Sequence, residues 1–136
     1  MPQLIAAPTR IPVPGGKVID EYVGAVNTPS TSLPRESSWA NTPSTTLAGS
    51  VSVAHMNAPG DWSEPFQTPE FGEITVVLRG TVLVDHDGGR LEVGEGQGVL
   101  TAPGERVRYS TGAEGAEYIA VCLPAFDPEA AHRDDD

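Results

Sequence analysis

Two carboxylates and one imidazole are the side chains of this sequence best suited to chemistry. Glu70 and Glu73 stand three positions apart at the start of a β-branched run, and His55 lies near the end of an earlier alternating segment. Two carboxylates this close can share a proton or hold a cation. A His–Glu pair is a competent unit for proton transfer near neutral pH. Which chemistry is available depends on the elements that position these side chains.

Short strands joined by tight turns account for most of the chain after residue 50. Alternating or β-branched segments predict strands at 51–56, 73–79, 81–86, 90–93, 97–101, 106–110 and 117–123. Asp87-Gly-Gly89 is typical of a hairpin turn. No sustained helical period is present, although Pro128 to His132 predicts a short terminal turn. The pattern predicts an all-β domain, either a small barrel or a sandwich.

The first fifty residues differ in composition from the rest. Residues 17–23 predict an edge strand that follows an apolar arm punctuated by proline. Residues 27–50 are rich in Ser, Thr and Pro, which predicts either a polar surface loop or a lid with Trp39 as its apolar anchor. We therefore divide the chain into an arm and loop (1–50), a barrel (51–126) and an acidic tail (127–136).

Charge and composition exclude several classes of protein. The 136 residues include 8 basic and 19 acidic side chains, a formal net charge of −11. Such a chain repels phosphate backbones and anionic lipids, so we expect neither a nucleic-acid nor a membrane partner. The one cysteine, Cys122, excludes an internal disulfide and a cysteine-based zinc site, and we expect it to be inert core. No signal-peptide pattern opens the sequence, so the expected location is cytoplasmic.

The stretch from residue 65 to 110 resembles the two motifs of the cupin family. The run from Glu73 to Gly80 has the spacing that ends the first motif, and Pro103-Gly104 resembles the corner of the second. The resemblance is greatest to the ethanolamine-utilisation type, which keeps the glutamate and lacks the histidines. It implies a double-stranded β-helix, or jelly-roll, barrel. It also implies a homodimer, to which residues 10–26 could contribute a strand.

The histidines that hold a metal in most cupins are absent. The corresponding positions are Gln67 and Pro69 in one register, Phe66 and Thr68 in the other, and Val107 in the second motif. Only Glu73 remains of the ligand set, and a lone carboxylate does not replace imidazoles as ligands of transition metals. We therefore expect no cofactor and no redox chemistry. A divalent metal held by His55, Glu70 and Glu73 is the less favoured option.

The cupin register places Glu73 inside the barrel, with Thr75 on the same face. Burial there raises the pKa of the carboxyl toward the range of a general acid or base, unless Glu73 is only a hydrogen-bonded structural residue. Tyr109 is predicted either to donate a hydrogen bond to a substrate oxygen or to be an aromatic residue of the rim.

The strand that carries His55 can take two orientations. One places Val51, Val53 and His55 inside, and the other places Ser52, Ala54 and Met56 there; the sequence does not choose between them. Substrate-binding side chains are expected at Glu70, Gln67, Trp62 and Thr75. Glu70 is alternatively a solvated loop charge.

Two functions fit these residues. The first is a non-redox enzyme of the isomerase, cyclase or lyase type, in which Glu73, His55 and Tyr109 act on a small organic molecule. The second is a non-catalytic binding or assembly module, because a barrel without metal ligands can serve as a sensor or scaffold. The first is narrowly favoured.

Overall fold

The computed structural model describes residues 2, 4–27 and 47–134; the expected loop and Trp39 therefore lie largely outside the described residues. The elements are β1 (Thr9–Pro12), a 3-10 turn η1 (Pro14–Gly16), β2 (Val18–Val23), α1 (Leu47–Ser50), β3 (Ser52–Ala58), β4 (Gly72–His86), β5 (Gly89–Val93), β6 (Gly98–Thr101), β7 (Val107–Leu123) and α2 (Pro128–Ala131). The all-β prediction is confirmed, and Pro128 begins the short turn expected near the end.

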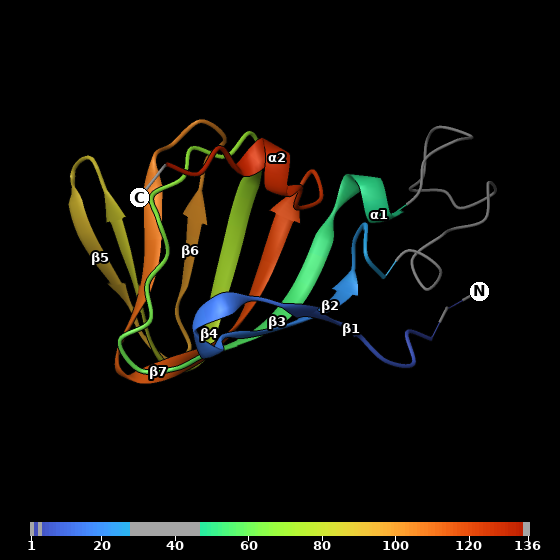
Figure 1. Cartoon of the computed structure of the whole chain (residues 1–136), viewed down its shortest axis with the longest axis horizontal. Helices are drawn as coiled ribbons and strands as arrows, with labels where there is room; N and C mark the ends of the chain where they lie inside the picture. Colours follow the sequence, from blue (N-terminus) through green and yellow to red (C-terminus); the bar gives the residue numbers. More distant parts are fainter. Residues whose placement is uncertain (1, 3, 28–46, 135–136) are drawn as a thin grey trace.

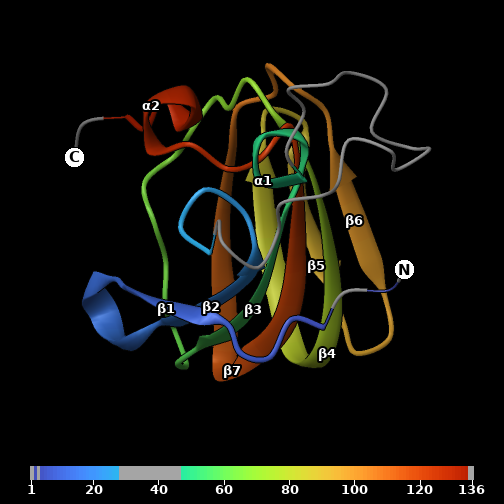
Figure 2. The ribbon, with the colours of Figure 1, turned by 90° about the vertical axis from the view of Figure 1, so that its right-hand side faces the viewer.

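The strands pair antiparallel in the order β1-β2-β3-β7-β4-β5, and β6 also pairs with β4 (Figure 1). The first part of β4 lies between β6 and the end of β7, and its second part lies between β5 and the start of β7. Because β4 and β7 each run through both parts, the sheet curls over itself as a jelly-roll. Figure 2 shows this curl, with β1 and β2 on one side and β4 and β6 on the other.

Glycine allows the long strands to bend. Gly80 has a φ of +79°, and a Cβ at this position would lie 2.1 Å from the carbonyl oxygen of Gly115. Only glycine fits such a backbone and such a contact. The sequence analysis treated Gly80 as the break between two strands, which is wrong. The strand continues through Gly80 with local shifts in its register to β7.

The same correction applies to the later strands. Segments 106–110 and 117–123, expected as two strands, form the single strand β7. Fully buried side chains of β4 and β7 fill the interior near the bend, among them Val77, Val82 and Tyr118. A smaller cluster joins Phe71 to Phe126, whose ring centroids are 5.5 Å apart, and fixes the segment before α2 to the barrel.

The N-terminal strands pair within their own chain. β2 lies antiparallel to β3, with Asp20 opposite His55, and β1 pairs with the outer edge of β2. Both strands thus extend the chain's own sheet, and the expected contribution of residues 10–26 to a partner barrel stays a prediction. No helix among the described residues is long and apolar enough to span a membrane.

The outer face of the sheet carries an apolar patch. Ile74 of β4 lies opposite Leu100 of β6 and Val121 of β7, and Val76 lies opposite Ile119. Cross-strand partners share a face, so these side chains form one surface. Leu100 is 71% exposed and Val76 is 41% exposed.

Candidate functional site

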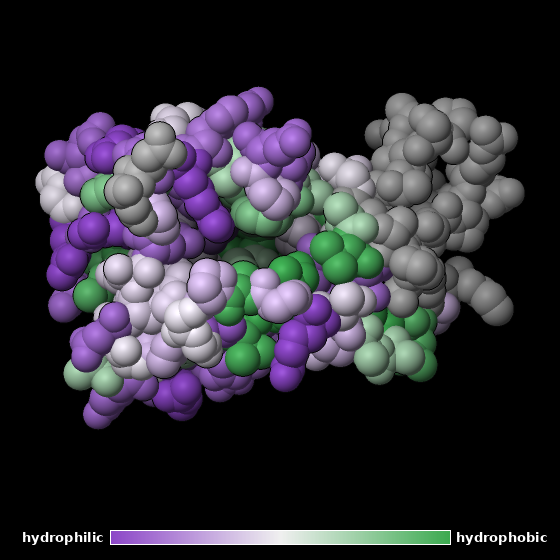
Figure 3. Space-filling model, in the orientation of Figure 1, coloured by the Kyte–Doolittle hydropathy of each residue, from purple (hydrophilic) through white to green (hydrophobic). Residues whose placement is uncertain are grey.

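A cavity of about 280 Å³ lies inside the curled sheet. Figure 3 shows the molecule hollowed between α2 and the β1–β2 segment, with hydrophobic residues at the rim. Its wall comes from both ends of the described chain and from the barrel strands: Ile11, Pro12, Val13, Lys17, Ile19, Glu21, Ser52, Ala54, Met56, Glu64, Gln67, Glu73, Tyr109, Tyr118, Ala120, Cys122, Phe126, Pro128 and Arg133. Most of these side chains are apolar, with a few polar groups among them, as in sites for small molecules.

Glu73 is the central polar group of this wall. Its position on β4, alternating with outward-facing neighbours, turns it into the cavity. The Thr75 hydroxyl donates a hydrogen bond to Glu73 Oε2 at 3.3 Å, and the Cys122 thiol lies 3.6 Å from Oε1. Burial, reinforced by the nearby charge of Glu64, raises the pKa of the Glu73 carboxyl to about 7. Near neutral pH both protonation states are therefore populated.

Lys17, the residue immediately before β2, also reaches the cavity. Its Nζ lies 4.1 Å from the ring centroid of Trp62 and 5.5 Å from that of Tyr118. Burial lowers the pKa of its amine, an effect opposed by the charges of Glu64 and Glu73. The sequence analysis missed this residue because a lysine at the start of an edge strand is usually solvated. One signal was present: Lys17 is the only lysine in the sequence.

Glu64 and Arg133 are two further charged groups of the wall, and neither was predicted. Burial raises the pKa of the Glu64 carboxyl, and the cations of Lys17 and Arg133 oppose that shift. Arg133 Nη2 lies 3.7 Å from Glu64 Oε2, and its Nε donates to Gln67 Oε1 at 3.5 Å. Gln67, expected to bind substrate, is buried and lines the cavity, and its backbone pairs with Val107.

Tyr109 and Cys122 face the cavity as protonated groups. The Tyr109 hydroxyl lies 2.9 Å from Thr101 Oγ1, and burial raises the pKa of the phenol. Burial likewise raises the pKa of the Cys122 thiol, and the charge of Glu73 adds to the effect. Tyr109 is thus held as a hydrogen-bonding group, and Cys122 has no thiolate character.

Four predicted site residues are not part of the wall: Trp62 contacts Lys17, Thr75 donates to Glu73, and His55 and Glu70 lie elsewhere. The strand β3 takes the second of the two orientations, so Ser52, Ala54 and Met56 line the cavity. His55 faces the opposite side of the sheet, where its Nε2 lies 2.6 Å from Glu117 Oε2. Glu70 is exposed and pairs with His132.

The structure therefore does not bring His55 or Glu70 to Glu73. Sheet pleating separates His55 from Glu73, because adjacent positions of a strand face opposite sides. The three side chains that were weighed as a divalent-metal site occupy three different environments. Among the described ranges, no group of three or more His, Cys, Asp or Glu side chains is arranged to hold a metal ion.

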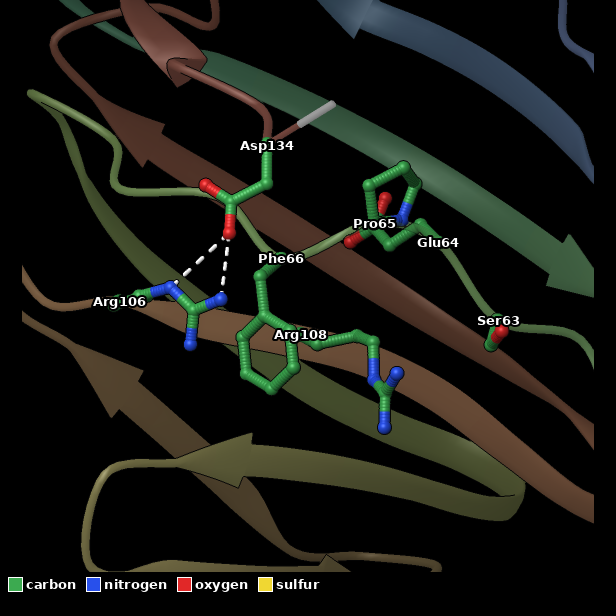
Figure 4. Close-up of a pocket in the computed structure, with 7 residues that line it drawn as sticks. All are labelled: Ser63, Glu64, Pro65, Phe66, Arg106, Arg108 and Asp134. Atoms are coloured by element: carbon green, nitrogen blue, oxygen red, sulfur yellow. Dashed lines mark hydrogen bonds and ion pairs between the residues drawn. The ribbon is translucent and has the colours of Figure 1, made fainter. Parts of the chain in front are cut away.

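A second, polar hollow of about 280 Å³ lies outside the barrel. Figure 4 shows the guanidinium of Arg106 between Phe66 and Asp134, with Arg108 on the same ring. Arg106 donates to Asp134 Oδ2 at 2.6 Å, and Arg108 donates to Asp85 Oδ2 at 2.9 Å. Each guanidinium thus already has a carboxylate partner.

The comparisons with known proteins extend over this same region. The profile of the AraC-binding-like domain family matches residues 35–133. A curated protein of Myxococcus xanthus, "Endoribonuclease YbeY", is 41% identical over 123 residues, which cover 90% of this chain and 36% of that protein. The chain thus spans little more than a third of this relative's length.

Solved structures share the fold at low sequence identity. An ethanolamine utilization protein Q of Salmonella typhimurium superposes with a TM-score of 0.58 and 16% identity, covering 81% of this chain and 71% of that one. A variant of oxalate decarboxylase from Bacillus subtilis gives a TM-score of 0.69 and 15% identity, covering 95% of this chain and 31% of that one. At these identities the likeness establishes the fold alone.

Proposed function

We propose that this chain, which belongs to the AraC-binding-like domain family and is a cupin, binds a small organic molecule in its cavity and acts on it by acid–base chemistry. The reaction class is a non-redox isomerisation, cyclisation or elimination. Each of these needs a group that both accepts and donates a proton during one turnover.

The observation that carries this proposal is Glu73 on the cavity wall with a pKa of about 7. A carboxyl of this kind accepts a proton from a carbon or hydroxyl of the ligand in its ionised form and returns it in its neutral form. The hydrogen bond from Thr75 fixes one carboxylate oxygen, which leaves the group oriented toward the ligand.

Tyr109 and Gln67 supply the positioning groups of the proposed site. Both line the cavity, and both carry polar atoms that can hold a ligand oxygen. His55 has no part in it, because it lies on the opposite face of the sheet. We do not extend the ribonuclease activity in the name of the Myxococcus relative to this chain, because a net charge of −11 disfavours binding to a phosphate backbone.

A binding module without turnover is the second candidate. It is favoured by the burial of Tyr109 and Cys122, which raises the pKa of both groups and keeps them protonated near neutral pH. Enzymes of this reaction class often use separate groups as acid and base. Glu73 without proton transfer from Tyr109 or Cys122 suits either a one-base reaction or a binding site.

Proton exchange distinguishes the two candidates. We expect the wild-type protein in deuterium oxide to exchange a hydrogen next to the carbonyl of at least one compound from a panel of small ketones, aldehydes and oxo acids, followed by proton NMR. Glu73→Gln keeps the shape of the side chain and removes the base, so exchange falls to the buffer rate. Glu95→Gln, at an exposed turn, is the matched control and keeps the wild-type rate. Exchange that survives in Glu73→Gln contradicts the proposed role.

A further inference from the structure

We propose that Lys17 anchors an anionic head group, so that the ligand of the cavity is a small organic acid with an apolar body. This inference rests on the proposed function only in taking the cavity as the ligand site. It names the chemical class that the cavity recognises, whether or not turnover follows.

The first argument is the unmet hydrogen-bonding capacity of Lys17. An ammonium carries three N–H donors and no acceptor. Within the described part of the chain, Lys17 Nζ makes cation–π contacts with the rings of Trp62 and Tyr118. It has no hydrogen bond there and no carboxylate oxygen within 4.0 Å. Aromatic faces attract a cation without accepting its hydrogen bonds as a carboxylate would. A cation held in this way gains most from an anion that supplies those acceptors.

The rings also fix where the ammonium lies. Trp62 packs against the barrel core, and Tyr118 is only 3% exposed, so both aromatic walls are rigid. Lys17 in turn lies at the end of the η1 turn, where Gly15 and Gly16 both take positive φ and bring the chain against Trp62 and Pro59. The side chain is therefore directed into the cavity by packing rather than by an ion pair.

The second argument concerns two of the three carboxyls on the same wall, Glu64 and Glu73. The third, Glu21, accepts hydrogen bonds from the backbone N–H groups of Val26 and Asn27. Burial disfavours the charged form of both Glu64 and Glu73, which raises the pKa of Glu64 and raises that of Glu73 to about 7. A protonated carboxyl donates a hydrogen bond and does not repel an anion. A cationic ligand would instead meet Lys17 and Arg133, which both line the cavity. The charges thus favour one negative group on the ligand.

The rest of the wall sets the body of the ligand. Ile11, Val13, Ile19, Met56 and Phe126 are among the apolar side chains of the wall. Such a lining stabilises a hydrocarbon chain or ring by removing it from water, at about 25 cal/mol per Å² of apolar surface. An acid with one charged end and an apolar remainder matches both parts of the cavity.

A pair of probes tests the anchor. Octanoate and octanamide have similar size and the same hydrocarbon chain, and differ in charge at the head. By titration calorimetry at pH 6, we expect the wild-type protein to bind octanoate at least tenfold more tightly than octanamide. In Lys17→Met, which keeps the length of the side chain and its contact with Trp62, we expect this preference to fall to less than threefold, with octanamide binding unchanged.

Two further variants distinguish a specific effect of Lys17 from a general effect of the positive charge of the protein. Lys17→Arg keeps a cation at the site and should retain a preference for octanoate. Arg10→Met removes a cation of the same chain at an exposed position paired with Asp20, so it should leave the preference at its wild-type value. Circular dichroism of each variant confirms that the fold is intact.

The single lysine provides a direct readout. In protein labelled with ¹³C-lysine, one Cε signal is expected, and it should shift on addition of octanoate and remain unchanged with octanamide. Equal binding of the two probes, binding of neither, or an unchanged preference in Lys17→Met each overturns the inference. A preference that depends on Lys17, together with no proton exchange attributable to Glu73, leaves the anchor in place and contradicts only the proposed enzymatic role.

Discussion

The thiol of Cys122 lies 3.6 Å from Oε1 of Glu73, its register partner on the neighbouring strand. Each group therefore affects the pKa of the other. The charge of Glu73 adds to the effect of burial in raising the pKa of the thiol. The hydrogen bond from the thiol partly offsets the rise that burial causes in the pKa of Glu73. Because both side chains face the cavity, either one reports on what the cavity holds.

The stability of the protein should fall between about pH 4.5 and pH 7 because of Glu73. The folded pKa of about 7 lies above the ordinary value of 4.5, so the folded state binds the additional proton and the stabilisation is lost as the pH rises through 7. The corresponding change in the free energy of unfolding is on the order of 3 kcal/mol. Urea unfolding at pH 5 and pH 8 measures it.

Glu73→Gln should remove this pH dependence and be more stable than the wild type at pH 8. The exposed Glu95→Gln variant should follow the wild-type curve. The same slope in Glu73→Gln as in the wild type would assign the effect to another group.

Cys122 should react slowly with iodoacetamide at pH 7.5. Burial keeps the thiol protonated, the side chain is only 4% exposed, and the thiolate is the reactive species. Mass spectrometry should show alkylation at least about tenfold faster in 8 M urea than in buffer. The chain has no other cysteine, so one mass increment is the whole signal. Equal rates in the two solutions would mean that Cys122 is accessible in the folded protein.

Gly80→Ala should destabilise the protein by roughly 2–4 kcal/mol, because the new Cβ would lie 2.1 Å from the carbonyl oxygen of Gly115. Gly96→Ala is the matched control, since Gly96 has the same φ of +79° with no atom within 4 Å of the added Cβ. We expect the control to lose only about 1 kcal/mol from backbone strain. Thermal unfolding followed by circular dichroism compares the two, and equal losses would contradict the importance of the contact.

We propose that the apolar patch of Ile74, Val76, Leu100, Ile119 and Val121 is covered by a second copy of this chain. At a net charge of −11 two copies repel one another, and these five apolar side chains form an uncharged part of the outer face through which the copies can meet. Light scattering after gel filtration should find a dimer in the wild type and a monomer in Leu100→Glu. Leu4→Glu, which adds the same charge at a residue 84% exposed outside the patch, should remain dimeric. A monomeric wild-type protein would contradict this proposal.

Alternation of side chains predicted the fold and part of the cavity. Glu73 and Thr75 lie on the inner face as expected, and Tyr109 lines the cavity. The orientation of β3 could not be predicted, because both of its faces carry apolar residues. Ser52, Ala54 and Met56 line the cavity, whereas Val53 faces the same side as His55. Because the outer face of the sheet carries an apolar patch, hydrophobicity alone did not show which face of β3 is turned toward the cavity.

Contacts between distant segments account for what the sequence analysis missed. Lys17 reaches the cavity only because β1 and β2 lie across it, and Arg133 does so only because the segment after α2 pairs with residues 66–70. Neither placement follows from a local pattern. The bend at Gly80 was interpreted as a turn for a related reason: a glycine signals a change of direction equally well within a strand and between strands.

The cavity wall also has a consequence for how the chain responds to a bound molecule. Residues of β1 and β2 form one side of the wall, and Phe126, Pro128 and Arg133 form another, so the two ends of the chain meet at the ligand. A ligand that contacts both segments stabilises both against local unfolding. The two segments are then expected to open together rather than independently. Amide hydrogen exchange in β2 and in the segment around α2 should therefore slow together when the cavity fills, although the two segments lie near opposite ends of the sequence.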